Sequence, residues 1–191
     1  MSRLTLILML ALGVPLAALA PLSAVADSKA DKERAEIRKT ATETLSLLYK
    51  TNPSLKASIG KAAGYAAFSN FSMKIFTAGG GTGKGLAVNN RTKQETFMRM
   101  AEVQAGLGVG VKKFRIVFVF ETDQALNNFV EQGWEFGGQG TAAATTGSQG
   151  AGLQGAISVS PGVWMYQLTD QGLAAEITGK GTKYWKDSDL N

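Results

Sequence analysis

The apolar positions of residues 105–120 follow two patterns in succession. In the first half, glycines alternate with branched apolar residues, which predicts an extended chain with bare backbone on one face. Residues 114–120 are nearly all apolar, β-branched or aromatic, which is typical of a strand covered on both faces. Lys112 and Lys113 predict a turn or sharp bend between the halves. Because interior glycines weaken a strand, their alternation indicates close packing at a barrel bend or, less often, a bound ligand.

The spacing of apolar residues and the residue types at helix ends predict three helices. Residues 27–49 contain no Gly or Pro and carry apolar side chains three or four positions apart, which indicates an amphipathic helix. A second, short helix is expected over residues 53–60. Thr122 starts the third helix, whose apolar face includes Trp134, and Gly133 marks its C-terminal end.

Short extended segments separated by turn residues occupy most of the chain beyond Gly64. A strand pair is expected around residues 69–70, a hairpin turn at residues 89–92, and a last hairpin around residues 169–172. These features predict an antiparallel α+β fold: a glycine-rich curled sheet, barrel- or sandwich-like, with an N-terminal amphipathic helix and one inserted helix.

The first 26 residues have the pattern of a secretory signal peptide. Arg3 precedes an apolar run over residues 4–12, and the small residues Ala24 and Ala26 form a cleavage site. A membrane anchor is the alternative. Cleavage near Ala26 would leave residues 27–191 as a single domain in the periplasm or outside the cell. The chain has no Cys, so no disulfide supports this domain.

The charge and the missing residue types narrow the function classes. A net charge of +5 on an exported chain suits anionic lipid headgroups or anionic polymers, whereas nucleic acid is a poor partner in that compartment. The absence of His and Cys removes the usual base, thiolate nucleophile and Zn²⁺ ligands. We therefore expect no catalytic residue, metal or cofactor, and hydrolysis by a pair of carboxylates is the formal alternative.

Residues 79–85 are similar to a phosphate-binding loop but do not match its pattern. Ala78 stands where the pattern needs Gly, and Gly85 stands where it needs a hydroxyl for Mg²⁺. A glycine hairpin is the simpler interpretation. The alternative is a donor-rich turn in which Lys84 meets an anionic headgroup.

Four motifs in order resemble the SYLF domain family. They are Gly64-Tyr65-Ala66-Ala67-Phe68, the glycine run 79–85, residues 117–126 with Phe129, and Gly172-Leu173-Ala174-Ala175.

The resemblance implies a non-catalytic, lipid-binding domain that contacts anionic phospholipid or a membrane surface through its N-terminal helix and nearby basic residues. In this chain the implied helix residues are Lys29, Lys32, Arg34, Arg38 and Lys39. Each Lys or Arg near an anionic surface contributes about 1 kcal/mol to attachment. A solvated face of mixed charge is the alternative interpretation of this helix.

Lys84, Lys112 and Lys113 form a second candidate patch for lipid. A different function, an envelope structural or protein-interaction domain with a protein partner, is favoured by the uncharged residues 137–157 and by the aromatic Tyr184 and Trp185 of the tail. The sequence predicts no oligomeric state.

Overall fold

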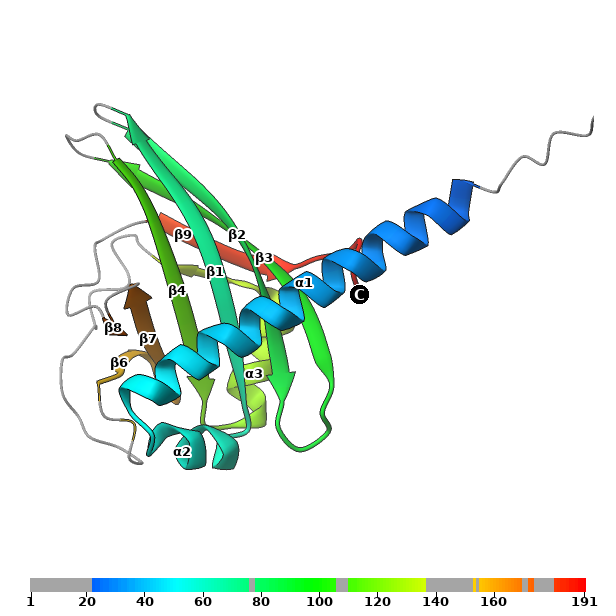
Figure 1. Ribbon diagram of the computed structural model, residues 1–191. Helices are drawn as coiled ribbons and strands as arrows, with labels where there is room; N and C mark the ends of the chain where they lie inside the picture. The colour runs from blue at the N-terminus through cyan, green and yellow to red at the C-terminus, as the bar shows by residue number, and fades with distance from the viewer. Residues whose placement is uncertain are drawn as a thin grey trace, which may run out of the picture.

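The computed structural model of the protein describes residues 22–75, 78–105, 110–136, 153, 155–169, 172–173 and 181–191. These residues form three helices and nine strands (Figure 1). In chain order they are α1 (Leu22–Thr51), α2 (Leu55–Lys61), β1 (Gly64–Ile75), β2 (Ala78–Asn89), β3 (Glu95–Ala105), β4 (Gly110–Phe120), α3 (Asp123–Gln132), β5 (Trp134–Phe136), β6 (Ile157–Ser160), β7 (Val163–Thr169), β8 (Gly172–Leu173) and β9 (Gly181–Lys186).

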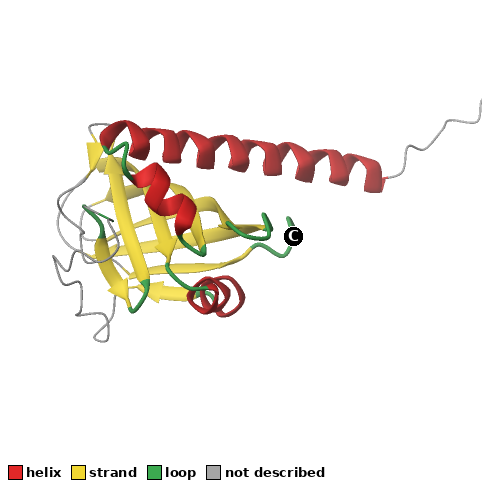
Figure 2. Ribbon diagram, turned by 90° about the horizontal axis from the view of Figure 1, so that it is seen from below, coloured by secondary structure: helices red, strands yellow, loops and turns green. Residues whose placement is uncertain are grey.

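All nine strands belong to one curled antiparallel sheet. Eight of them follow the order β5-β9-β3-β2-β1-β4-β7-β6, and β8 pairs with β7. Helices α1 and α2 lie on one side of the sheet and α3 lies on the other (Figure 2). The predicted α+β fold with a curled, glycine-rich sheet is therefore confirmed.

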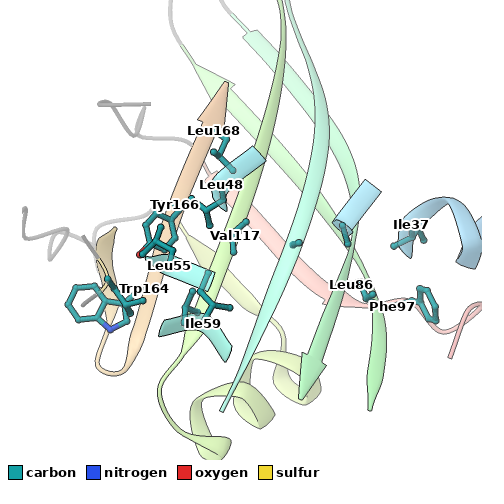
Figure 3. Packing of buried hydrophobic residues seen from close by; sticks show 14 of the residues in the cluster. Ile37, Leu48, Leu55, Ile59, Leu86, Phe97, Val117, Trp164, Tyr166 and Leu168 are labelled. Atoms are coloured by element: carbon teal, nitrogen blue, oxygen red, sulfur yellow. The ribbon is translucent and has the colours of Figure 1, made fainter. Parts of the chain in front are cut away.

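Side chains alternate between the two faces of each strand, so the sheet has two apolar clusters. On the α1 side, Leu48 of α1 and Leu55 and Ile59 of α2 pack near Val117 and Tyr166 of the sheet (Figure 3).

On the α3 side, aromatic rings dominate the packing. The ring centroids of Phe68 and Tyr184 are 4.9 Å apart, and those of Phe118 and Phe129 are 5.3 Å apart. The sheet is thus covered on both faces along β1 and β4.

Three predicted turns are wrong, and all three segments lie inside strands. Ser69 is in the middle of β1, paired with Lys84 of β2 and Arg115 of β4. The glycine run 79–85 belongs to β2, and Lys113 belongs to β4, where it pairs with Phe71. Strand pairing overrides the local turn propensity in all three segments: Ser69 and the glycine run pair with strands on both sides, and Lys113 pairs with β1.

Gly85 shows why β2 contains glycine. A Cβ atom at this position would lie 2.3 Å from Cδ1 of Phe68 and 2.6 Å from the carbonyl oxygen of Ala67. The missing side chain therefore lets the Phe68 ring pack against the backbone of β2. The sequence pattern suggested a close approach at a different set of glycines, those that alternate with apolar residues before Lys112. Most of that set, residues 106–109, lies outside the described residues.

Helix α3 begins and ends at the predicted residues. The Thr122 hydroxyl accepts a hydrogen bond from the Ala125 N–H at 3.1 Å, and Gly133 follows the helix with φ +71°. Trp134, however, begins β5 and is not part of the helix. The positive φ of Gly133 turns the chain so that β5 can pair with β9.

Helix α1 is longer than predicted and extends beyond the edge of the sheet at its N-terminal end (Figure 2). The predicted signal segment 1–26 falls largely outside the described residues, as does most of the segment 137–157. Among the described helices, none combines the length and apolar character that a membrane-spanning helix needs.

Candidate functional site

An open groove of about 710 Å³ lies between α1 and the neighbouring face of the sheet. Its helix side is formed by Glu36, Ile37, Thr40 and Glu43, and its floor includes basic and hydroxyl side chains of β1, β2, β3 and β4. The groove continues the face that α1 and α2 cover with apolar residues, so one sheet face is apolar at one end and polar at the other.

The strand register creates a row of cations on this floor. Ser69 of β1 lies opposite Lys84 on one side and Arg115 on the other, and Lys84 in turn lies opposite Arg99 of β3. Directly opposed residues point to the same face with Cβ atoms about 4.5–5.5 Å apart. Lys113 stands two positions before Arg115 and so on the same face, which brings four cations together in one groove.

Two of these cations are neutralised by acids. Lys84 forms an ion pair with Glu33 of α1, and Arg99 Nε lies 2.6 Å from a carboxylate oxygen of Asp187. The hydrogen bond from Arg99 to Asp187 raises the pKa of the guanidinium. These two pairs fix the positions of β2 and β3 relative to α1 and the C-terminal turn.

Lys113 and Arg115 differ from the other two cations. Neither forms a hydrogen bond or ion pair within the part of the chain that the structure describes, and both border the open groove. Two adjacent, uncompensated cations beside the hydroxyls of Ser69 and Thr82 provide the donors that an anion such as phosphate accepts from.

The basic residues predicted on the N-terminal helix divide into two groups. Arg34 Nε donates to the carbonyl of Leu190 at 2.9 Å, and Arg38 Nε lies 2.7 Å from Glu95 Oε2. Arg38 also lies over the ring of Phe97, with its guanidinium carbon 5.0 Å from the ring centroid. These two arginines therefore hold α1 against β3 and the C-terminal end.

The three lysines of the helix patch, Lys29, Lys32 and Lys39, are exposed and have no hydrogen-bond or ion-pair partner among the described residues. In the second predicted patch, Lys84 and Lys113 do line one groove, whereas the side chain of Lys112 lies outside the described residues.

Sequence reasoning missed Arg99, Arg115, Glu36 and Glu43 as groove residues. A signal for Arg115 was present, because Lys113 and Arg115 stand two positions apart in an extended segment and must share a face. No comparable signal connects Arg99 with these two residues, since their proximity depends on the register of four strands. The position of Glu36 and Glu43 depends on how α1 packs on the sheet. Among the described residues, no three acidic side chains are close enough to hold a metal ion.

The fold and the groove define a small α+β domain in which a curled antiparallel sheet carries a helix across one face. Residues 101–191 match the Ysc84 family, described as "Las17-binding protein actin regulator". This family is also called SYLF, so the predicted resemblance is confirmed by the match over these residues.

A curated relative, Beta cell expansion factor A of Aeromonas veronii, is 33% identical to this chain over 163 residues. The matched region covers 84% of this chain and 60% of the relative, so the chain spans about three fifths of that protein's length.

Proposed function

We propose that this chain is an exported, non-catalytic lipid-binding domain that attaches to surfaces of anionic phospholipid. The observation that carries the proposal is the pair Lys113 and Arg115, two cations without a partner in the described residues on the floor of an open groove. The match of residues 101–191 to the SYLF family, which is associated with lipid binding or actin regulation, supports the same class of function.

Charge on α1 supplies the second part of the proposed surface. Lys29, Lys32 and Lys39 are exposed, and cations close to an anionic membrane contribute about 1 kcal/mol each. The nearby acids Glu36 and Glu43 reduce this sum. Attachment is therefore expected to be reversible and sensitive to salt.

An exposed apolar residue lies beyond the cations on the same face of β3. Val103 is 69% exposed and stands four positions from Arg99, so its side chain is on the groove side of the strand. A valine at the edge of a cationic surface can enter the apolar boundary of a bilayer, which adds to electrostatic attachment.

Co-sedimentation of the purified chain with vesicles tests this proposal. We expect binding to phosphatidylglycerol vesicles at low salt and little binding to phosphatidylcholine vesicles. Binding should be lost at high salt, because the Debye length falls from about 10 Å at 0.1 M to about 3 Å at 1 M. Equal binding to both lipids, or binding that salt does not change, would contradict the proposal.

Variants connect the binding to the α1 lysines. Changing Lys29, Lys32 and Lys39 together to Gln should weaken vesicle binding by about tenfold, since part of roughly 3 kcal/mol is lost. A control that changes Lys50, Lys56 and Lys61 to Gln removes the same charge from exposed positions at the other end of α1 and on α2. If the control variant loses as much binding as the first, net charge and not this surface is responsible.

A protein-interaction domain is the second candidate function. The family description, which names Las17 binding, favours it. Recovery of a stoichiometric protein partner in a pull-down, together with no recovery on anionic vesicles, would support this candidate over lipid binding.

A further inference from the structure

Opposite charges face each other across the groove without meeting. Lys113 and Arg115 lie on the sheet floor, and Glu36 and Glu43 lie on the α1 side. None of these four side chains forms a hydrogen bond or ion pair within the described residues. Elsewhere between α1 and the sheet, acids and cations that are within reach do pair, as in Glu33 with Lys84 and Arg38 with Glu95.

The two acids belong to one side of the helix. Glu36, Thr40 and Glu43 follow at intervals of four and three positions, so they share the face of α1 that borders the groove. The Thr40 hydroxyl therefore lies between two carboxylates, and this helix side of the groove can accept hydrogen bonds from a cation. The sheet side can donate hydrogen bonds to an anion, through Arg115, Lys113, Ser69 and Thr82.

A ligand with only one sign of charge pairs with only one side of this groove. A free phosphate would be attracted by Arg115 and Lys113 but repelled by the two glutamates. A simple amine would be attracted by the glutamates but repelled by Arg115 and Lys113. A ligand that carries a phosphate and an ammonium group satisfies both sides at once. The volume of about 710 Å³ is in the range of sites that hold small molecules of this size and larger.

We propose that the groove binds a phosphate ester whose alcohol carries an ammonium group, as in phosphoethanolamine. The phosphate lies on Arg115 and Lys113, with Lys84 adjoining, and the ammonium group faces Glu36 and Glu43. This inference rests on the proposed lipid-binding function where the ester is the headgroup of phosphatidylethanolamine. The same chemistry is also carried by soluble phosphoethanolamine, and the two sources are separated by experiment.

An apolar ring in the lining of the groove suits the lipid source. Trp185 of β9, which is partly exposed, lines it together with the charged residues, whereas the lining residues Ile37 and Leu168 are buried. The Trp185 ring would contact the glycerol and the first methylene groups of a lipid beyond its phosphate.

Titration calorimetry on the purified full chain tests the site with three probes: O-phosphoethanolamine, inorganic phosphate and ethanolamine. We expect phosphoethanolamine to bind at least tenfold more tightly than either of the other two. Arg115→Gln should weaken phosphoethanolamine and phosphate alike by tenfold or more. The double variant Glu36→Gln/Glu43→Gln should weaken phosphoethanolamine by about tenfold while phosphate binds as well as before or better. Arg91→Gln, a charge-matched change on the exposed turn between β2 and β3, should leave all three affinities unchanged.

Vesicles distinguish the lipid source. Phosphatidylethanolamine in phosphatidylcholine vesicles should increase binding of the chain, Arg115→Gln should abolish this increase, and soluble phosphoethanolamine should displace the chain. If soluble phosphoethanolamine binds but phosphatidylethanolamine has no effect, the proposed site is supported and its ligand is soluble.

Two results overturn the inference: equal affinity for the three soluble probes, or no soluble binding together with no preference for phosphatidylethanolamine over phosphatidylcholine. Neither depends on phosphatidylglycerol binding. If the chain binds phosphatidylglycerol vesicles but fails these tests, the proposed surface function is supported and the headgroup site is rejected. If it passes these tests but does not bind phosphatidylglycerol, the headgroup site is supported and the anionic surface function is rejected.

Discussion

The guanidinium Nε of Arg99 donates to a carboxylate oxygen of Asp187 across 2.6 Å and so joins β3 to the C-terminal turn. The two side chains differ in environment, because that of Asp187 is 1% exposed and that of Arg99 is 40% exposed. The other carboxylate oxygen accepts from the Asp189 N–H at 3.1 Å. Asp187 is thus a buried charge whose compensation comes from one partly exposed cation and one backbone donor.

Removing that charge should destabilise the fold. We expect Asp187→Asn to lower the free energy of unfolding by about 2 kcal/mol, because a charge-assisted hydrogen bond in a buried position is lost. Asp189→Asn is the control: Asp189 also pairs with Arg99, at 3.1 Å, but it is 75% exposed. Its loss should cost no more than about 0.5 kcal/mol. Urea denaturation of both variants measures the difference, and equal effects would contradict the role assigned to burial.

Alkaline pH should unfold the protein through its buried tyrosines. Burial, and secondarily the charge of Glu102, raises the pKa of Tyr184 above its ordinary value, and burial raises the pKa of Tyr166. The unfolded chain begins to lose tyrosine protons near pH 10 while the folded chain keeps them. Stability is therefore unaffected by these groups below about pH 10 and falls above it. Melting temperatures across this range should fall less steeply for Tyr184→Phe than for the natural chain.

The hydroxyl of Tyr166 has no hydrogen-bond partner among the described residues although it is buried. Tyr166→Phe removes this unpaired group and keeps the ring, so we expect the free energy of unfolding to rise by about 1 kcal/mol. Tyr49→Phe, at a half-buried position, should change it little. Thermal unfolding at neutral pH compares the two. A loss of stability in Tyr166→Phe would show that the hydroxyl is satisfied.

Two glycine substitutions should differ in sign. Gly85→Ala places a Cβ atom 2.3 Å from the Phe68 ring and should cost about 1–3 kcal/mol through overpacking. Gly60 lies in α2, and a Cβ atom at this position would have no neighbouring atom within 4 Å. Gly60→Ala should therefore be neutral or stabilise by up to about 1 kcal/mol. Chemical denaturation of the two variants checks this. Similar losses in both would contradict the close approach of Phe68 to β2.

Adjacent residues of α1 should affect different properties. Arg38 pairs with Glu95 and lies over Phe97, so Arg38→Gln should lower the free energy of unfolding by about 1 kcal/mol. Lys39 is exposed and has no such partner in the described residues, so Lys39→Gln should leave stability unchanged and weaken binding to anionic vesicles. Melting temperature and vesicle co-sedimentation, measured on both variants, separate anchoring of the helix from contact with lipid.

The elements that could be predicted are those whose signals are local. Thr122 and Gly133 define α3 because capping and a positive φ are properties of a few consecutive residues. The apolar run before Thr122 is likewise a buried strand, β4, as its composition indicated. These features, together with the helical spacing of α1, were enough to predict the fold class.

The groove could not be predicted because it depends on register. Lys84, Ser69 and Arg115 come together only through the pairing of β2, β1 and β4, and the turn predicted at Ser69 would have separated them. Lys113 was assigned to a bend, since two lysines between apolar segments are a common turn signal. In the folded chain these polar residues continue strands whose other ends are buried, which local pattern alone does not reveal.

Strand β9 pairs with β3 along residues 98–103, although some eighty positions separate the two strands in the chain. During synthesis, one edge of β3 therefore stays open until residues 181–186 have left the ribosome. An unpaired edge is a template for association with other chains. A nascent chain that stalls before residue 181 would thus expose that edge and be a target for chaperones and proteases.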